Sequence, residues 1–287
     1  MDYREGRYTS QDGLSLYYRD YGPRLGGKTP VLCLAGLTRN SADFGRIAKQ
    51  LMDERRVICP DYRGRGQSDH DPRWQNYQPP TYLGDLRHLL AALNLHRVFV
   101  IGTSMGGLLA MGMGAAMPGV LAGVLLNDVG PEIGETGVER IIEYMQDGEA
   151  GFDDWPAAAT YLQDKFPDLP ARTEEEWLWI AKGTYREAAD GRIEHNWDYN
   201  LIKPILENPE TVDLWPLFLS LRGRPLVVTR GALSEILTEE TLEKMQAAVP
   251  ELVAVTVDGV GHMPSLSEPE CQEALNHALA VADRSHH

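Results

Sequence analysis

Residues 98–107 read VFVIGTSMGG, and this stretch decides how the whole chain is interpreted. The apolar run VFVIG leads into a Gly-x-Ser-x-Gly segment, and the helical pattern LLAMGMGAAM follows from residue 108. A serine held in a strained turn between a buried strand and a helix exposes its hydroxyl, which requires small residues two positions away on either side. Gly102 and Gly106 meet that requirement. The stretch therefore predicts Ser104 as a nucleophile.

Short apolar runs of the same kind alternate with longer helical patterns. Such runs suit strands buried on both faces, and the alternation indicates right-handed βαβ crossovers in a mostly parallel sheet. Residues 14–20, LSLYYRD, follow a turn signal and predict an earlier antiparallel strand. The fold class is therefore α/β, with a mostly parallel central sheet flanked by helices. The remaining runs are VLCLAG from residue 31, RVICPD from 56, VLLND from 124, PLVVTRG from 225 and LVAVTV from 252.

The alternation stops between residues 131 and 220, where the pattern is helical and five of the six tryptophans occur. We interpret this stretch as a helical cap inserted between two late strands, with residues 1–130 and 221–283 forming the core. The cap would cover the carboxyl ends of the strands, where open α/β sheets bind ligands. Of its tryptophans, Trp155, Trp179 and Trp197 are candidates to line a substrate pocket.

Two backbone N–H groups are predicted to stabilise negative charge next to Ser104. Met105 begins the helix after the turn, so its N–H faces developing charge. The second donor is expected in the loop after VLCLAG, where the N–H of Leu37 follows Gly36. Arg39 in the same loop has two interpretations, a substrate-carboxylate anchor or, as the more ordinary alternative, a member of an intraprotein salt bridge.

A general base is expected after the last strand. The loop GVGHMP follows LVAVTV and supplies His262 between glycines and a proline. No other histidine before residue 286 follows a core strand in this way. His262 is therefore the predicted base.

Composition and charge exclude several classes of function. A formal charge of −15 argues against nucleic acid or an anionic membrane surface as a partner, because both require a basic face. Three widely spaced cysteines suggest buried thiols and not a disulfide framework or a metal site. With no apolar leader or membrane-spanning stretch in the sequence, the cytoplasm is the expected location. Residues 284–287, RSHH, read as the remnant of an expression tag.

Taken together, six motifs resemble the α/β-hydrolase superfamily, particularly its bacterial esterase-like members. This resemblance implies a serine hydrolase of that fold and covers nearly the whole chain outside the cap. The family usually has His-Gly where this chain has Ala35-Gly36, which puts the geometry of the oxyanion loop in question. The motifs are LAGLTRNSADF, DYRGRGQSD, GTSMGG, LLNDVGPEI, VVTRGALSEIL and GVGHMPSLSEP.

The resemblance implies a carboxylate that orients His262, and it leaves two candidates. Many relatives place this acid after the strand PLVVTRG, where Ser234 takes the expected position and Glu235 follows one residue late. Others place it one strand earlier, where Asp128 ends VLLND, 24 residues after Ser104. Asp128 is preferred over Glu235, and both remain open.

The function implied is hydrolysis of a small-molecule carboxylic ester through an acyl-enzyme on Ser104, with no metal or organic cofactor. A lactone or a carbon–carbon bond could be cleaved by the same triad, and some members of the fold are ligand receptors with vestigial hydrolysis. Serine at the position where aspartate would be needed speaks against epoxide hydrolase or dehalogenase chemistry. The sequence does not indicate an oligomeric state.

Overall fold

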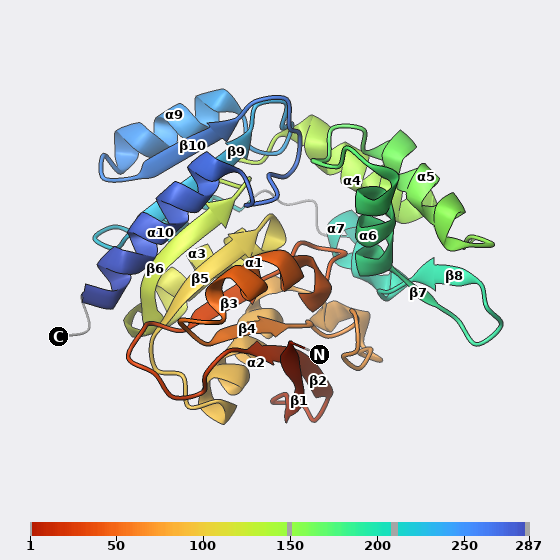
Figure 1. The fold of residues 1–287 in the computed structure, drawn as a ribbon, viewed down its shortest axis with the longest axis horizontal. Coiled ribbons are helices and arrows are strands. Elements are labelled where there is room, and N and C mark those ends of the chain that lie inside the picture. Colours follow the sequence, from red (N-terminus) through yellow and green to blue (C-terminus); the bar gives the residue numbers. More distant parts are fainter. Residues whose placement is uncertain (1, 148–150, 208–211, 285–287) are drawn as a thin grey trace.

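An eight-stranded sheet forms the centre of the computed structural model, which describes residues 2–147, 151–207 and 212–284 (Figure 1). The strand order is β1-β2-β4-β3-β5-β6-β9-β10. β1, β2 and β4 pair antiparallel, and the remaining neighbours pair parallel, so the predicted fold class is confirmed. The strands are β1 (Tyr3–Thr9), β2 (Ser15–Tyr21), β3 (Val31–Leu34), β4 (Val57–Pro60), β5 (Val98–Thr103), β6 (Leu121–Asn127), β9 (Leu226–Gly231) and β10 (Val253–Val257).

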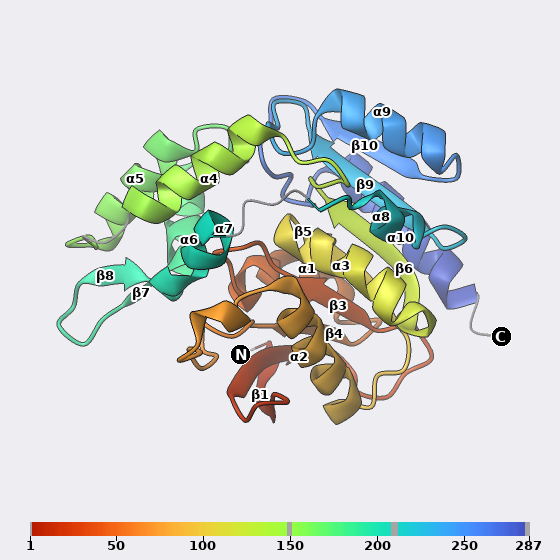
Figure 2. The same cartoon turned by 180° about the vertical axis from the view of Figure 1, so that it is seen from behind.

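Helices cover both faces of this sheet. α1 and α10 lie on the face turned to the viewer in Figure 1, and α2, α3 and α8 lie on the opposite face in Figure 2. α3 starts directly after β5 and packs on β3, β5 and β6, which fixes the start of that helix at the carboxyl edge of the sheet. The helices outside the segment between β6 and β9 are α1 (Gly45–Leu51), α2 (Pro79–Ala92), α3 (Met105–Ala116), α9 (Glu239–Ala248) and α10 (Pro269–Arg284), with single 3-10 turns at Ser41–Phe44, Trp74–Asn76 and Pro118–Val120.

Burial of the strands follows their composition, with two differences from prediction. Every residue of β3, β4, β5, β6 and β9 is buried, as expected for apolar strands covered on both faces. β10 is an edge strand and leaves Val253 40% exposed, so LVAVTV is not buried on both faces as predicted. β1 was not predicted, because its sequence YREGRYT is polar and forms the opposite edge.

The segment between β6 and β9, residues 128–225, is called the insert below. It contains the predicted helices, but also a two-stranded antiparallel hairpin that the helical pattern did not indicate. The last of its helices, α8, packs on α3 of the core and not over the carboxyl edge of the sheet. Its elements are α4 (Glu135–Asp147), α5 (Trp155–Lys165), α6 (Glu174–Thr184), β7 (Tyr185–Glu187), β8 (Ile193–His195), a 3-10 turn (Tyr199–Ile202), α7 (Lys203–Glu207) and α8 (Trp215–Leu219).

Backbone hydrogen bonds fasten the insert to the loop after β4. Gly66 N–H donates to Asn196 C=O at 2.9 Å, and Asp198 N–H donates to Gly64 C=O at 2.8 Å. Between them, Arg65 and Trp197 form an isolated antiparallel bridge, and both side chains are buried. These contacts attach residues 196–198 of the insert to the core.

No helix in the described part of the chain has both the length and the apolar character needed to cross a membrane. Of the residues interpreted as a tag remnant, Arg284 ends α10, and residues 285–287 lie outside the described residues.

Candidate active site

Ser104 occupies the strained turn that its sequence context predicted. Its backbone has φ 51° and ψ −120°, a region that side-chain-bearing residues rarely adopt, and α3 begins at the next residue. Gly106 permits the close approach of this turn to β3, because a Cβ atom on it would lie 2.0 Å from the carbonyl oxygen of Leu34. Such strain at a serine that lines a cavity is typical of a functional turn.

The two predicted oxyanion donors belong to the residue after Ser104 and to a loop that approaches Ser104. Met105 is the first residue of α3, so its N–H has no acceptor within the helix. Leu37 follows Gly36, and a Cβ atom placed on Gly36 would lie 3.7 Å from the Cβ atom of Ser104. The loop that carries Leu37 is therefore close to Ser104. Among the backbone hydrogen bonds of turns, loops and caps in the described residues, none has the N–H of Leu37 or Met105 as its donor.

Arg65 hydrogen-bonds to this loop, a role that was not predicted from the sequence. Its fully buried guanidinium donates through Nε to the carbonyl oxygen of Leu37, and Nη1 donates to Arg63 C=O at 3.0 Å. Nη2 lies 3.7 Å from Met105 Sδ. Arg65 therefore contacts both residues predicted to bind the oxyanion. The sequence has Ala35-Gly36 in this loop in place of His-Gly, so no histidine at position 35 can support it.

His262 is paired with Asp128. Asp128 Oδ2 accepts from His262 Nδ1 at 2.5 Å, and the aspartate side chain has 0% exposure. Asp128 Oδ1 accepts the N–H of Gly231 at 2.9 Å. A carboxylate bonded to Nδ1 leaves Nε2 of the imidazole to accept a proton.

The other candidate acid has a different partner. Glu235 Oε2 lies 3.2 Å from Arg140 Nη1, and its side chain is 44% exposed. The structure therefore places Asp128 against the imidazole and pairs Glu235 with a cation of α4.

Ser234 and Asn127 also belong to the site, although neither was predicted to have a functional role. Ser234 Oγ donates to Asp128 Oδ2 at 2.5 Å, so the residue at the usual acid position hydrogen-bonds to the acid of the neighbouring strand. Asn127 Nδ2 donates to Pro264 C=O at 3.0 Å and to Thr103 Oγ1 at 3.2 Å, which ties the His262 loop to the strand that carries Ser104. The only signal for these residues was polarity at the ends of buried strands.

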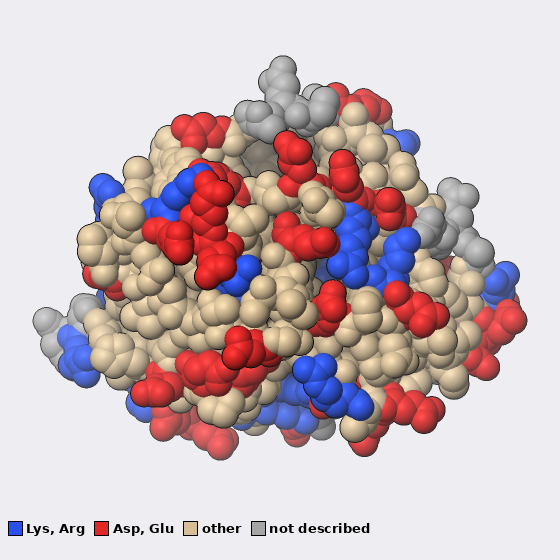
Figure 3. Space-filling view, turned by 90° about the horizontal axis from the view of Figure 1, so that it is seen from above, with Lys and Arg blue, Asp and Glu red and all other residues tan. Residues whose placement is uncertain are grey.

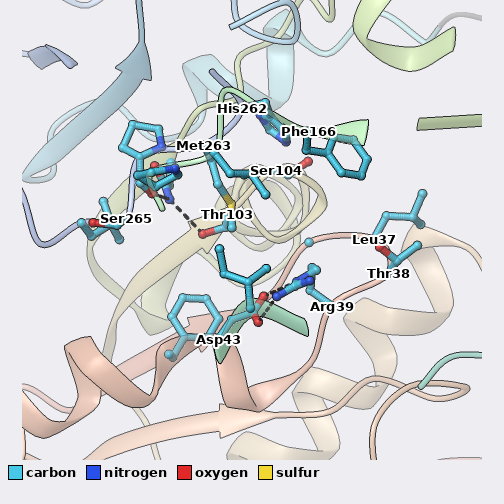
Figure 4. Close-up of a pocket in the computed structure, with 18 of the residues that line it drawn as sticks. Leu37, Thr38, Arg39, Asp43, Thr103, Ser104, Phe166, His262, Met263 and Ser265 are labelled. Atoms are coloured by element: carbon cyan, nitrogen blue, oxygen red, sulfur yellow. Dashed lines mark hydrogen bonds and ion pairs between the residues drawn. The ribbon is translucent and has the colours of Figure 1, made fainter. Parts of the chain in front are cut away.

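Ser104 and His262 open onto one cavity of about 190 Å³ between the sheet edge and the insert (Figure 4). Its walls are mostly apolar, and the insert contributes Ile141 and Tyr144 from α4, with Leu162, Phe166, Leu169, Pro170, Trp179 and Ile180 further along. Burial raises the pKa of Tyr144 to about 12, so its phenol stays protonated at neutral pH.

Of the tryptophans predicted to line the pocket, the structure places only Trp179 on this cavity. Trp155 begins α5 and is not among the lining residues, and the Lys182 ammonium lies over its ring at 5.9 Å. Trp197 is 3% exposed and packs on His195 and Tyr199 where the insert joins the core. Helical periodicity identified these residues as part of the insert but could not tell which face each would occupy.

Arg39 lines the cavity, but its guanidinium is held by an acid of the same protein. Nη2 and Nε donate to the two carboxylate oxygens of Asp43 at 2.6 and 2.7 Å, and Nη1 donates to Thr184 Oγ1. Figure 4 shows this pair apart from Ser104, His262 and Phe166. Arg39 is therefore a member of an intraprotein salt bridge, the second of the two interpretations of this residue.

Comparisons with known proteins agree with this architecture. Residues 31–271 match the model of the alpha/beta hydrolase family. A protein of Cupriavidus necator named 3-hydroxybutyrate-oligomer hydrolase is 33% identical over 262 residues, covering 88% of each chain. A protein of Mesorhizobium japonicum named 2-(acetamidomethylene)succinate hydrolase is 25% identical over 248 residues, covering 84% of each.

A solved structure, an alpha/beta hydrolase from Novosphingobium aromaticivorans, is 42% identical with a TM-score of 0.91, over 98% of this chain and 99% of that chain. The family match covers most of the sequence, and the similarity of fold extends to the insert. This chain belongs to the alpha/beta hydrolase family.

Proposed function

We propose that this protein is a serine hydrolase that cleaves small carboxylic esters through an acyl-enzyme on Ser104. The observation that carries the proposal is the hydrogen bond between buried Asp128 and His262, whose imidazole opens onto the same cavity as the strained Ser104. A nucleophile, a base and a carboxylate that holds the base are the three parts that acyl transfer to serine requires.

The mechanism follows from the positions of these groups. Ser104 Oγ attacks the carbonyl carbon while His262 Nε2 takes its proton, and the N–H groups of Leu37 and Met105 stabilise the tetrahedral oxyanion. The resulting imidazolium is stabilised by Asp128 and protonates the departing alcohol. Water then enters, His262 removes its proton, and collapse of the second tetrahedral intermediate releases the carboxylic acid and free Ser104.

The name of one relative supports an ester as the substrate. The relative that is 33% identical is named for hydrolysis of 3-hydroxybutyrate oligomers, whose units are joined by ester bonds. A lactone is a cyclic ester and a second substrate class for the same three residues. A receptor of this fold would instead retain its ligand, so sustained turnover of a simple ester separates the catalytic role from that alternative.

Covalent labelling tests the nucleophile directly. A 4-nitrophenyl alkylphosphonate should add once to the protein and stop ester hydrolysis, because the phosphonyl group mimics the tetrahedral intermediate on serine. Peptide mass mapping should place the adduct on residues 102–107, and Ser104→Ala should take up none. An adduct on another serine, or unimpaired hydrolysis after labelling, would contradict the assignment.

Trp179 is expected to influence which neutral acyl chains are accepted. Trp179→Ala should lower the ratio of kcat/KM for 4-nitrophenyl hexanoate to that for the acetate about fourfold, because exposing one of the four additional CH2 groups costs about 0.8 kcal/mol. The acetate rate itself should change little. Trp155→Ala is the matched control, since Trp155 is in the insert but not on the cavity. Equal effects of the two substitutions would mean that Trp179 acts only through packing of the insert.

A further inference from the structure

The cavity beside Ser104 contains three charged side chains among its apolar walls. Two of them, Arg39 and Asp43, neutralise each other through a bidentate ion pair. The third is Arg46 of α1, whose side chain is 44% exposed. Arg46 takes no part in the ion pair between Arg39 and Asp43.

The structure gives Arg46 a platform but only a weak acidic partner. Its guanidinium lies over the ring of Trp179 at 4.4 Å, and both residues line the cavity. The nearest carboxylate oxygen, Glu176 Oε1, is 4.0 Å from Arg46 Nη1, which is the limit of an ion pair.

Glu176 is occupied mainly by its own helix. Its Oε2 accepts the backbone N–H of Arg172 at 2.7 Å and that of Thr173 at 3.3 Å, closing the capping box of α6. These N–H groups, that of Arg172 first, lower the pKa of Glu176. The carboxylate is thus fixed at the start of α6. Its contact with Arg46 stays at the 4.0 Å limit of an ion pair, so the charge of the guanidinium is only partly balanced.

We propose that Arg46 binds a carboxylate at one end of the substrate while the ester at its other end reaches Ser104. The inference rests on the proposed function and names its substrate class: small esters that carry a free carboxylate. Arginine suits this task because its planar guanidinium can bind both carboxylate oxygens and can stack on an aromatic ring at the same time.

The negative net charge of the protein bears on how an anionic substrate could bind. The formal charge is −15, and Figure 3 shows acidic side chains spread over the face viewed from above, with basic ones in smaller groups. Such a surface does not attract an anion by itself. A cation on the cavity wall that is not fully neutralised therefore supplies a local reason for an anionic ester to bind.

Binding can be measured without turnover in Ser104→Ala. Calorimetry should compare monomethyl adipate with dimethyl adipate, and 6-acetoxyhexanoate with its methyl ester, so that the carboxylate is tested at the acyl end and at the alcohol end. We expect the anionic member of at least one pair to bind more tightly than its neutral partner. Adding Arg46→Gln should weaken that anionic ligand about tenfold and the neutral one less than twofold.

Arg46→Lys should retain part of the preference, because it keeps the charge but loses the planar fork. Lys182→Gln is the matched control: it removes an exposed cation of α6 that does not line the cavity, and it should change neither affinity. Equal binding of both members in both pairs, or equal weakening of both by Arg46→Gln, would overturn the proposal. Failure of the wild-type protein to hydrolyse any of these esters, with the binding preference intact, would instead count against the proposed esterase function.

Discussion

Ser104→Ala is expected to lower kcat on an activated ester by on the order of 10⁴- to 10⁶-fold, the range seen when a serine nucleophile is removed from a triad. The substitution removes Oγ, so no acyl-enzyme can form. A small residual rate should persist, because the proposed oxyanion donors, the N–H groups of Leu37 and Met105, would still stabilise the oxyanion of a reaction with water. The measurement is kcat on 4-nitrophenyl acetate, in an assay that can detect a rate about 10⁶-fold below that of the wild type.

The fold should survive this change. Alanine keeps the Cβ atom and the backbone at Ser104, and the contacts of Gly106 with β3 do not involve the hydroxyl. Thermal unfolding should therefore occur at nearly the same temperature in both proteins. Ser265→Ala is a suitable control, because Ser265 lines the same cavity but its Oγ donates to Glu268. Retention of more than a tenth of the activity by Ser104→Ala would refute the nucleophile.

Most of the sheet was predictable because its central strands are buried on both faces and are therefore apolar throughout. The same reasoning failed at the edges. β1 has a polar sequence that carries no strand signal beyond its tyrosines, and the β7–β8 hairpin is held by the packing of the insert, not by local propensity. LVAVTV read as a buried strand, but apolar composition alone does not reveal which strand stands at the edge.

The positions of site residues were predictable where the residue follows a strand of the sheet. Ser104 and His262 each follow a core strand on a glycine-flanked turn, and parallel strands bring such turns to one edge. Selection between Asp128 and Glu235 depends on details that one sequence does not contain. Asp128 turns toward His262 from a backbone with φ 57°, whereas Glu235 follows a turn in which Ser234, and not the glutamate, points to the acid.

Partners that are distant in sequence were the hardest to foresee. The bond from Arg65 to Leu37 joins loops 28 residues apart, and the contact of Arg46 with Trp179 joins the core to the insert. Neither contact leaves a periodic or spaced pattern in the sequence. Such contacts follow from the tertiary arrangement of loops and helices, which is why the cavity could be expected while most of its lining could not.

Asp128→Asn should lower kcat by on the order of 10⁴-fold, by analogy with triads in which the orienting carboxylate becomes an amide. An asparagine can offer its NH2 group to His262 Nδ1, which would leave the proton on Nε2, where the base must accept one. The amide also cannot stabilise the imidazolium that forms during the reaction. The amide oxygen, in the place of Oδ1, still accepts from Gly231 N–H, and Ser234 Oγ can accept from the NH2 group that takes the place of Oδ2, so the fold should be retained, as thermal unfolding can verify.

Glu235→Gln is the matched control for this prediction. It makes the same change from carboxylate to amide close to His262, but Glu235 is paired with Arg140 and is partly exposed to solvent. Only an interaction that is screened by solvent and by Arg140 is lost, so kcat should fall by no more than a few-fold. The reverse ranking would transfer the orienting role to Glu235. Losses of only a few-fold in both variants would show that the 2.5 Å contact between Asp128 and His262 does not set the rate, because an amide would then serve as well as the carboxylate.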